Sequence, residues 1–337
     1  MVASKDKVLA VAKVGFADIA GGKSMPENAM FWIASQSKPM TATALMMLVD
    51  EGKVNVADPV EKYLPEFKGQ MVIAEKDQEH VLLKKPVHPI TVKNVLSHTS
   101  GLPFASPLER PTLDLLPLAD RVHSYAALPL EFEPDSKYQY SNEGINVAGR
   151  IIEVVSGMPY EEFMQKRIFD PLGMKDTTFW PNEEQVSRLA KTYKPNAAKD
   201  GLEETKITQL LHSLTDRTKR CPMPAGGLFS TTQDTARFCQ MILNGGTLEG
   251  RRYLSGEAVK QMTSRQTPPD LKDSYGFGWS AGEGSAGHGG AYATNMSVDF
   301  KRGLVFVYSV QHAGFPGAGG KAQDAFRKAA IALFGAQ

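Results

Sequence analysis

One segment of this 337-residue chain is apolar on nearly every side of a helix. Residues 40–49 read Met-Thr-Ala-Thr-Ala-Leu-Met-Met-Leu-Val, and Gly52 follows as a helix stop. A helix without a polar face is stable only where other elements cover it on all sides. We therefore expect this helix at the centre of the molecule, with the rest of the chain packed around it.

Both ends of the chain carry strand patterns. Residues 8–18 are rich in Val and Ala and lead into the turn-forming pair Gly21-Gly22. Residues 295–300 alternate between polar and apolar side chains, and a short turn then leads into the apolar run 304–310. Residues 322–333 return to helical spacing, so they predict a helix that covers one face of this sheet.

The middle of the chain is different, because helical patterns such as residues 91–98 and 160–169 alternate with Pro- and Gly-rich loops. The predicted fold class is therefore α+β: an antiparallel sheet from both chain termini, flanked by helices, with an inserted all-helical domain. We expect residues 1–67 and 225–337 to form the sheet domain and residues 68–224 to form the insertion. The active site is expected at the seam between them.

Composition excludes several classes of partner. The 38 basic and 37 acidic residues give a net charge of +1, which argues against nucleic acid or an anionic membrane and favours a neutral, small-molecule partner. No apolar run reaches the ~20 residues that a membrane span needs, and the first residues lack a signal-peptide core. We expect a cytoplasmic or periplasmic protein, and the oligomeric state stays open. His and Cys spacings predict neither a metal nor a cofactor.

The segment Ser35-Gln36-Ser37-Lys38 lies just before the expected central helix. There, unpaired backbone N–H groups can stabilise an oxyanion beside the Ser35 hydroxyl. Lys38 is three residues further on, so helical spacing brings its amine to that hydroxyl, and burial favours the neutral, basic amine. The bland alternative is an N-capping serine followed by a surface lysine. The same pattern at Ser4 and Lys7 lies in a charged stretch and is not expected to be functional.

Tyr140-Ser141-Asn142 precedes a second helical pattern. Its phenol can pass a proton between nucleophile and leaving group, and the Asn142 amide can orient a substrate carbonyl. The alternative is that Ser141 or Asn142 is only the N-cap and Tyr140 only packs. In the helix that follows, one face is predicted apolar, and the other is predicted polar with Glu143, Asn146, Arg150 and Glu153.

A third motif, His288-Gly289-Gly290, leads into the C-terminal hairpin. Glycines without side chains let the backbone approach a ligand, so the Ala291 N–H can act with the Ser35 N–H as an oxyanion donor. His312, which is followed by Ala-Gly, ranks well below His288 because it lacks the double glycine.

With these motifs in place, the chain resembles the serine β-lactamase and penicillin-binding-protein-like superfamily. Its resemblance is to the class C branch, which includes family VIII carboxylesterases and D-Ala-D-Ala carboxypeptidases, and it extends to residues 90–102, 170–174 and 224–230. The resemblance implies that Ser35 is the acylated nucleophile and that Lys38 and Tyr140 share the general-base and general-acid roles. It also implies that Asn142 binds substrate and that His288 lies on the strand lining the site.

Three departures from that family shape the functional expectation. His288-Gly289-Gly290 stands where class C enzymes carry Lys-Thr-Gly, which removes the cation that would hold a β-lactam carboxylate. Asp135 stands where a glycine is common, and few residues precede the first strand where the family carries a helix. We expect a carboxylesterase acting on short-chain acyl esters.

Two alternatives remain open at this point. One is a D-Ala-D-Ala carboxypeptidase or a weak class C-like β-lactamase, and the other is a non-catalytic binding or sensor module. The residues leave undecided whether Lys38 or Tyr140 is the base, and they do not define the acyl chain length.

Overall fold

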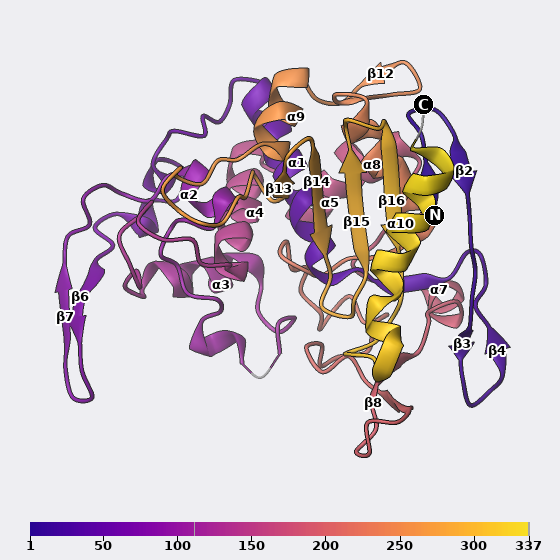
Figure 1. The fold of residues 1–337 in the computed structure, drawn as a ribbon. Coiled ribbons are helices and arrows are strands. Elements are labelled where there is room, and N and C mark those ends of the chain that lie inside the picture. Colours follow the sequence, from indigo (N-terminus) through magenta and orange to yellow (C-terminus); the bar gives the residue numbers. More distant parts are fainter. Residues whose placement is uncertain (111, 336–337) are drawn as a thin grey trace.

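A computed structural model describes residues 1–110 and 112–335 (Figure 1). Its main sheet has six antiparallel strands in the order β13-β14-β15-β16-β1-β2. The strands are β13 (Ser280–Gly282), β14 (Ser285–Gly289), β15 (Asn295–Asp299), β16 (Leu304–Tyr308), β1 (Val2–Ala3) and β2 (Val8–Ala10). Val2 pairs with Phe306, so the two chain ends meet in one sheet, as the sequence predicts.

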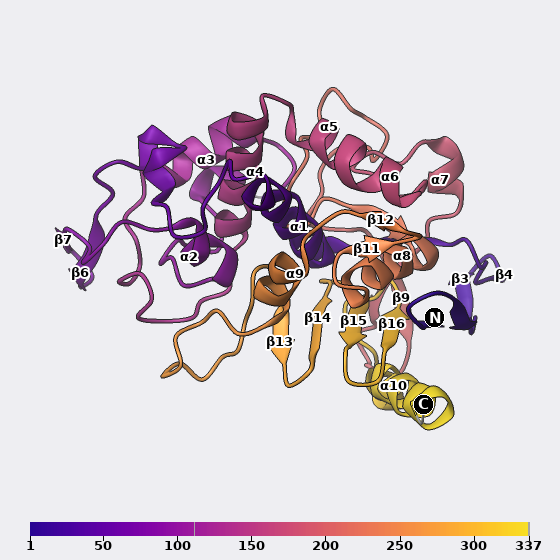
Figure 2. The same ribbon diagram turned by 90° about the horizontal axis from the view of Figure 1, so that it is seen from above.

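Helices cover both faces of this sheet. Helix α10 (Ala322–Phe334) lies on one face and α8 (Thr232–Leu243) on the other, as Figure 2 shows. Phe326 of α10 packs edge-on against Phe306. Because β15 is covered on both sides, Ser297 and Asp299 are buried, although their alternation with apolar residues predicts a polar face.

The expected central helix is α1 (Ser37–Asp50), and every residue from Ser37 to Leu48 is buried. It packs against α4 (Asn142–Ser156) on one side and α9 (Gly256–Thr263) on the other, between the sheet and the helical part of the chain (Figure 2). Gly52 ends the α1 region with a φ of +69°, a conformation that glycine adopts without strain. The prediction of a helix buried on all sides is confirmed.

Residues 68–224 contain six helices within the described part of the chain. They are α2 (Val92–Ser97), α3 (Leu118–Ala126), α4, α5 (Tyr160–Met164), α6 (Asp170–Leu172) and α7 (Glu183–Ser187). The pattern at 160–169 continues past Asp170-Pro171, because a π-helical turn (Gln165–Phe169) joins α5 to α6, and Gly173 ends the run. No helix of residues 1–110 or 112–335 is long and apolar enough to cross a bilayer.

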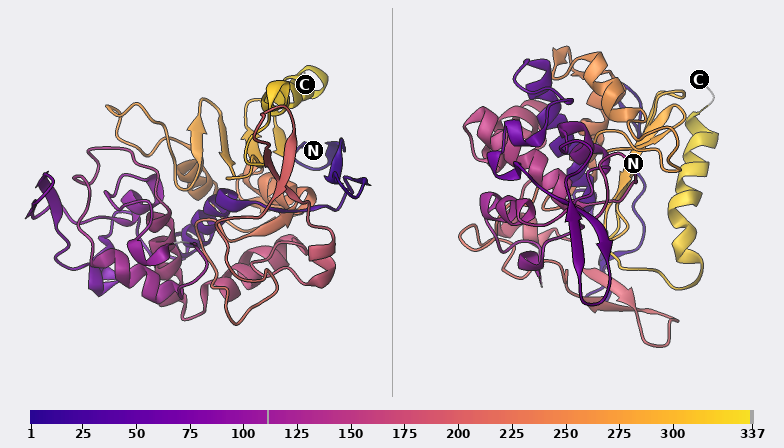
Figure 3. Two further views of the ribbon diagram at one scale, coloured as in Figure 1. Left: turned by 90° about the horizontal axis from the view of Figure 1, so that it is seen from below. Right: turned by 90° about the vertical axis from the view of Figure 1, so that its left-hand side faces the viewer.

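The prediction of an all-helical insertion is wrong in one respect. Strands β6 (Val72–Lys76) and β7 (Val81–Lys84) form a hairpin that projects from the helical side of the molecule (Figure 1 and Figure 3). A second hairpin pairs β8 (Thr192–Pro195) with β9 (Leu202–Thr205). Branched apolar residues such as those of β7 suit an extended strand, and each hairpin is stable here because it is anchored to the larger core.

Two of the shorter strand pairs include residues that precede α1. Strand β5 (Met30–Trp32) pairs with β10 (Phe229–Thr231) and leads directly to the 3₁₀ turn η1 (Ala34–Gln36). Strands β3 (Phe16–Asp18) and β4 (Lys23–Ser24) form the N-terminal hairpin. Asp135 adopts a φ of +65°, so it takes the left-handed conformation for which a glycine is common, and aspartate tolerates it better than most residues.

Candidate active site

The backbone around Ser35 is rigid and strained. Ala34 has a φ of +46°, which is unfavourable for a residue with a side chain. The Ser37 hydroxyl donates to the Ala34 carbonyl at 2.7 Å and accepts from the Leu228 N–H at 3.2 Å. Ser35 is half-buried between buried neighbours. The turn before α1 therefore presents the Ser35 hydroxyl from a fixed position.

The Lys38 amine is completely buried and has three oxygen neighbours. Its Nζ lies 3.1 Å from the Ser35 Oγ, 2.8 Å from the Asn142 Oδ1 and 2.7 Å from the Ala225 carbonyl oxygen. Burial lowers the pKa of Lys38 well below its ordinary value. A neutral amine has two hydrogens and one lone pair. Since Asn142 Oδ1 and the Ala225 carbonyl can only accept, the lone pair is left for the Ser35 hydroxyl.

Tyr140 lies on the other side of the same pair. Its ring centroid is 4.6 Å from the Lys38 Nζ. Burial raises the pKa of Tyr140 above its ordinary value, and a hydrogen bond with Ser35 acts in the opposite direction. Tyr140 therefore stays protonated at neutral pH. The structure brings together the hydroxyl, the amine and the phenol that the sequence singles out.

Helix α4 begins at Asn142, and Ser141 separates it from Tyr140. Ser141 is its N-cap, since its hydroxyl oxygen accepts from the Gly144 N–H at 3.3 Å and its O–H donates to the Pro103 carbonyl at 2.5 Å. The capping interpretation is therefore right for Ser141. The Asn142 Oδ1 accepts from Lys38. Within the described residues, the Asn142 Nδ2 has no acceptor.

Sequence reasoning missed an aromatic group around Tyr140. The rings of His98, Phe104 and His288 lie 4.6, 6.4 and 6.0 Å from the Tyr140 ring, measured between centroids. Tyr275 packs on His98 at 4.7 Å. Tyr275 comes from an irregular segment before β13, where no local pattern marks it, so only the tertiary structure shows that it belongs to the site.

His98 also holds the backbone of the site. It ends α2 with a φ of +60°, and its Nδ1 accepts from the Ser141 N–H at 3.2 Å. Burial lowers the pKa of His98 well below its ordinary value. The neutral ring therefore carries its hydrogen on Nε2.

His288 lies on β14, as the family resemblance implies, and both of its ring nitrogens are engaged. Nδ1 is 2.7 Å from the Gly289 carbonyl oxygen, and Nε2 is 3.0 Å from the Tyr275 hydroxyl. Because a carbonyl only accepts, Nδ1 carries the hydrogen and Nε2 accepts from Tyr275. Burial lowers the pKa of His288 to about 3. This position therefore carries no positive charge at neutral pH.

The two glycines after His288 differ in their packing. A side chain on Gly290 would come within 2.5 Å of the Ile33 carbonyl oxygen and 2.2 Å of the Thr294 hydroxyl, whereas Gly289 has space around it. Gly290 thus lets the turn after β14 approach the backbone just before Ser35. Ala291 is exposed in this turn. In the described ranges, neither its N–H nor that of Ser35 has a backbone acceptor, so both are available to an oxyanion.

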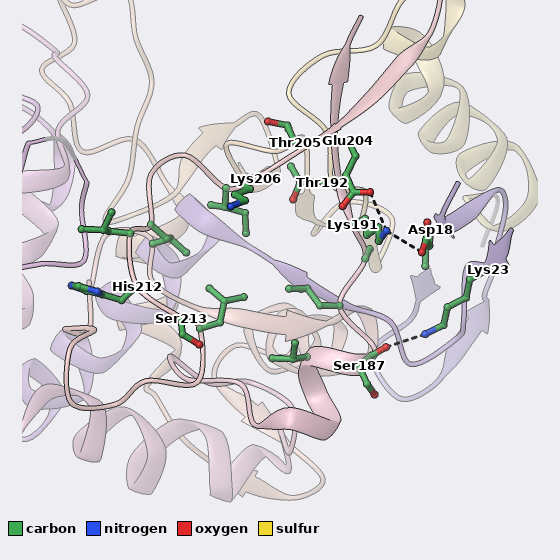
Figure 4. Close-up of a pocket in the computed structure, with 18 residues that line it drawn as sticks. Asp18, Lys23, Ser187, Lys191, Thr192, Glu204, Thr205, Lys206, His212 and Ser213 are labelled. Atoms are coloured by element: carbon green, nitrogen blue, oxygen red, sulfur yellow. Dashed lines mark hydrogen bonds and ion pairs between the residues drawn. The ribbon is translucent and has the colours of Figure 1, made fainter. Parts of the chain in front are cut away.

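A cavity of about 550 Å³ lies elsewhere, between the β3–β4 hairpin and residues 204–214 (Figure 4). Lys191 pairs across it with Asp18 at 3.1 Å and with Glu204 at 3.0 Å. None of the predicted site residues lines this cavity, so we do not assign it to the chemistry. Its apolar wall includes Leu210, which packs against the cluster that contains Ala34 and Tyr292.

The competing sequence motifs lie outside the site. The Ser4 hydroxyl donates to Asp6 at 2.7 Å, and Lys7 is exposed. His312 packs on Phe315 with ring centroids 3.7 Å apart, and its Nδ1 accepts from the Gly314 N–H. Among the residues described, no three or more His, Cys, Asp or Glu side chains are grouped so that they could hold a metal ion.

The chain is similar in sequence to a family model and to several known proteins. A family model described as Beta-lactamase matches residues 1–330. Protein Rv1367c of Mycobacterium tuberculosis (strain ATCC 25618 / H37Rv) is 30% identical, with 93% of this chain and 84% of that protein covered. A protein of Salmonella agona (strain SL483) named "Putative D-alanyl-D-alanine carboxypeptidase" is 31% identical, with 75% of this chain and 59% of that protein covered.

Solved structures show the same fold. EstCE1, described as "a hydrolase with promiscuous acyltransferase activity", has a TM-score of 0.79 at 23% identity, with 96% of this chain and 91% of that chain covered. The LovD9 mutant of Simvastatin Synthase from Aspergillus terreus has a TM-score of 0.79 at 20% identity, with 99% of this chain and 92% of that chain covered. At these identities the likeness concerns the fold and not the substrate.

Proposed function

The chain belongs to the beta-lactamase family, and from this premise we propose that it is a serine hydrolase that forms an acyl-enzyme on Ser35. We propose short-chain carboxylic esters as its substrates. The observation that carries the proposal is the set of contacts of Lys38. Two pure acceptors take the hydrogens of its neutral amine, so its lone pair faces the Ser35 hydroxyl.

In the proposed acylation, Lys38 takes the proton of Ser35 while Oγ forms a bond to the ester carbonyl carbon. The N–H groups of Ser35 and Ala291 bind the resulting oxyanion, and one such donor is worth roughly 2.7–4 kcal/mol in the transition state. Collapse of this intermediate breaks the bond to the alkoxide, which takes a proton through Tyr140. Tyr140 is in turn supplied from the Lys38 ammonium, and Asn142 Nδ2 orients the substrate carbonyl.

Deacylation reverses these roles. A water molecule takes the place of the alcohol, loses a proton to the Lys38–Tyr140 pair and adds to the acyl carbon. Ser35 leaves with a proton, and a carboxylic acid is released. Lys38 is assigned as the base because burial favours its neutral form, and Tyr140 as the acid because burial favours its phenol.

The choice of esters rests on charge at His288. A peptide or β-lactam substrate carries a carboxylate that needs a cation, whereas His288 is neutral and held by Tyr275 and Gly289. An ester needs no such anchor, and its alkoxide leaves more readily than an amine. Phe104, half-exposed beside Tyr140, offers an apolar surface for the acyl or alcohol group.

A second candidate, a D-Ala-D-Ala carboxypeptidase or weak β-lactamase, is favoured by the name of the Salmonella relative. Hydrolysis of p-nitrophenyl acetate and butyrate, run beside nitrocefin and a D-Ala-D-Ala peptide, separates the candidates. We expect ester turnover that disappears in Ser35→Ala, with slow or no cleavage of the other two substrates. Fast peptide release would support the second candidate. Covalent labelling of Ser35 without any turnover would indicate a sensor or binding module.

A further inference from the structure

Asn146 lies one helical turn after Asn142 on α4, and it is completely buried although the sequence pattern assigns it to the polar face. The two amides act on the same target. Asn142 Oδ1 accepts one hydrogen of the Lys38 amine at 2.8 Å. Asn146 Oδ1 accepts the Ala225 N–H at 3.1 Å, and the carbonyl of that residue accepts from Lys38 at 2.7 Å. The polar atoms of Ala225 thus link Asn146 to Lys38.

The chain of hydrogen bonds continues away from the site. Asn146 Nδ2 donates to the Tyr125 hydroxyl at 2.9 Å, and that hydroxyl donates to Glu109 Oε1 at 2.7 Å. The Arg121 Nε lies 3.3 Å from the same oxygen. Tyr125, Glu109 and Arg121 are all buried. These groups form a continuous buried network from the ion pair in the helical part of the chain to the amine at the seam.

The donor and the acceptor of each hydrogen bond in the network can be assigned, because some of the groups can only donate or only accept. Glu109 as a carboxylate only accepts, so Tyr125 must donate to it and accept from Asn146 Nδ2. The Asn146 amide is then oriented with its oxygen toward the Ala225 N–H. In a rotated amide, the Asn146 Nδ2 would face the Ala225 N–H, so two donors would meet. The Asn146 Oδ1 would face the Tyr125 hydroxyl oxygen, so two acceptors would meet.

We infer that Asn146 and Tyr125 are positioning residues for the Lys38 amine. They hold the backbone at Ala225, so that the Ala225 carbonyl orients the amine with its lone pair toward the Ser35 hydroxyl. The inference rests on the proposed function of Lys38 as the base. Neither residue touches the substrate, and both act through Ala225. A lone pair turned away from Ser35 would leave the amine present but unable to take the proton.

Other hydrogen bonds hold the same stretch of backbone, and one of them acts on the Pro224 carbonyl, which belongs to the same peptide unit as the Ala225 N–H. The Pro224 carbonyl accepts from the Thr41 hydroxyl at 2.8 Å, and the Gly226 carbonyl accepts from the Trp32 Nε1 at 2.8 Å. Loss of the Tyr125 hydroxyl therefore removes the acceptor of Asn146 Nδ2 and loosens one of the two contacts on this peptide unit, while the Thr41 and Trp32 contacts keep the segment in place.

The test uses Tyr125→Phe and Asn146→Ala in the full chain, with Tyr193→Phe as the matched control. Tyr193 is also buried, and its hydroxyl accepts the Ile19 N–H at 2.8 Å in a different part of the molecule. Two measurements are made from pH 5 to 10. One gives kcat and KM for p-nitrophenyl acetate, and the other gives the rate at which a fluorophosphonate labels Ser35, which reports activation of the hydroxyl without turnover.

For both test variants we expect labelling and kcat to fall about tenfold with KM changed less than twofold. The acidic limb of the profile should move to lower pH, because the Lys38 ammonium would lose an acceptor and become more acidic. Tyr193→Phe should keep the wild-type rates, and the acidic limb of its pH profile should lie at the same pH as in the wild type. A merely structural role would lower the rate without moving the limb.

The outcomes separate this inference from the proposed function. Test variants with wild-type rates and an unmoved limb would overturn the positioning role while leaving the function in place. A wild type that labels at Ser35 but cleaves no ester would overturn the ester proposal, and the labelling profile would still decide the positioning role. A wild type that neither labels nor cleaves would overturn both.

Discussion

At the scale of single residues, the unusual feature is a lysine that is fully buried without a carboxylate partner. The described contacts of the Lys38 amine are a hydroxyl, an amide oxygen and a carbonyl oxygen. Burial of a charge without an opposite charge is costly, so the group is held in its neutral form. The aromatic rings of His98, Tyr140 and Tyr275 pack together on this side of the site.

Replacing Lys38 by Met tests the base. We expect kcat/KM for p-nitrophenyl acetate to fall at least a thousandfold, because an apolar side chain of similar length cannot take the Ser35 proton. The matched control is Lys7→Met in the same Ser-x-x-Lys spacing, which should keep wild-type activity. Equal effects of the two substitutions would show that the amine of residue 38 has no special role.

At the scale of elements, α4 decides more of the site than its sequence pattern suggests. Ile145, Ile151 and Ile152 are buried, as the apolar face predicts. Glu143 is buried as well, although it is predicted on the polar face, and the two residues before it bond to the carbonyls of Pro103 and Phe104. Neither carboxylate oxygen of Glu143 has a hydrogen-bond partner among the described residues. Burial, together with Glu109 and Glu131, raises the pKa of Glu143 to about 9.

Glu143→Gln should therefore stabilise the protein at alkaline pH. In the unfolded chain this carboxyl ionises near pH 4.5, whereas in the folded protein it keeps its proton to about pH 9. The wild type thus loses up to ~1.4 kcal/mol of unfolding free energy per pH unit between these values, and glutamine does not. Urea unfolding at pH 5 and pH 8 measures the difference between the two proteins. A difference that is the same at both pH values would mean that Glu143 is already ionised in the folded state.

At the scale of the whole molecule, one apolar core joins the sheet to the helical part. The cluster that includes Leu45 of α1 also includes Ile145 of α4, Phe238 of α8 and Val298 of β15. Since α1 is covered from both sides, neither part keeps its core without the other. We propose that residues 68–224 form an inserted region that is coupled to the remainder and does not unfold separately.

Thermal unfolding tests this coupling. We expect far-UV circular dichroism and tryptophan fluorescence to give one coincident transition, with Trp180 reporting on the insertion and Trp32 and Trp279 on the remainder. Leu45→Ala, at a completely buried position of α1, should lower the free energy of unfolding by about 2–5 kcal/mol and shift both signals together. Two separate transitions, of which Leu45→Ala shifts only one, would contradict the coupling.

Local sequence was sufficient for the elements and for the main motifs. The all-round apolar pattern of residues 40–49 predicts the central helix, and alternation predicts the hairpin of β15 and β16, because burial follows side-chain periodicity. Ser35 and Lys38 stand out because a hydroxyl and an amine lie three residues apart just before an apolar helix, and Tyr140 because its phenol precedes a second helical pattern. The β6–β7 hairpin was missed, since a short apolar run has no period that separates strand from helix.

What the tertiary structure alone decided is which groups meet. Tyr275, which lies in no recognisable motif, holds the ring of His288 through a hydrogen bond, and burial leaves that ring uncharged. Asn146 and Glu143 carry polar side chains at positions that look exposed, yet both are buried, and Asn146 bonds to Tyr125 and Ala225, which are remote from it in sequence. Burial and hydrogen-bond partners depend on packing between segments that are remote in sequence. Periodicity within one helix therefore cannot define them, whereas it does define the helix itself.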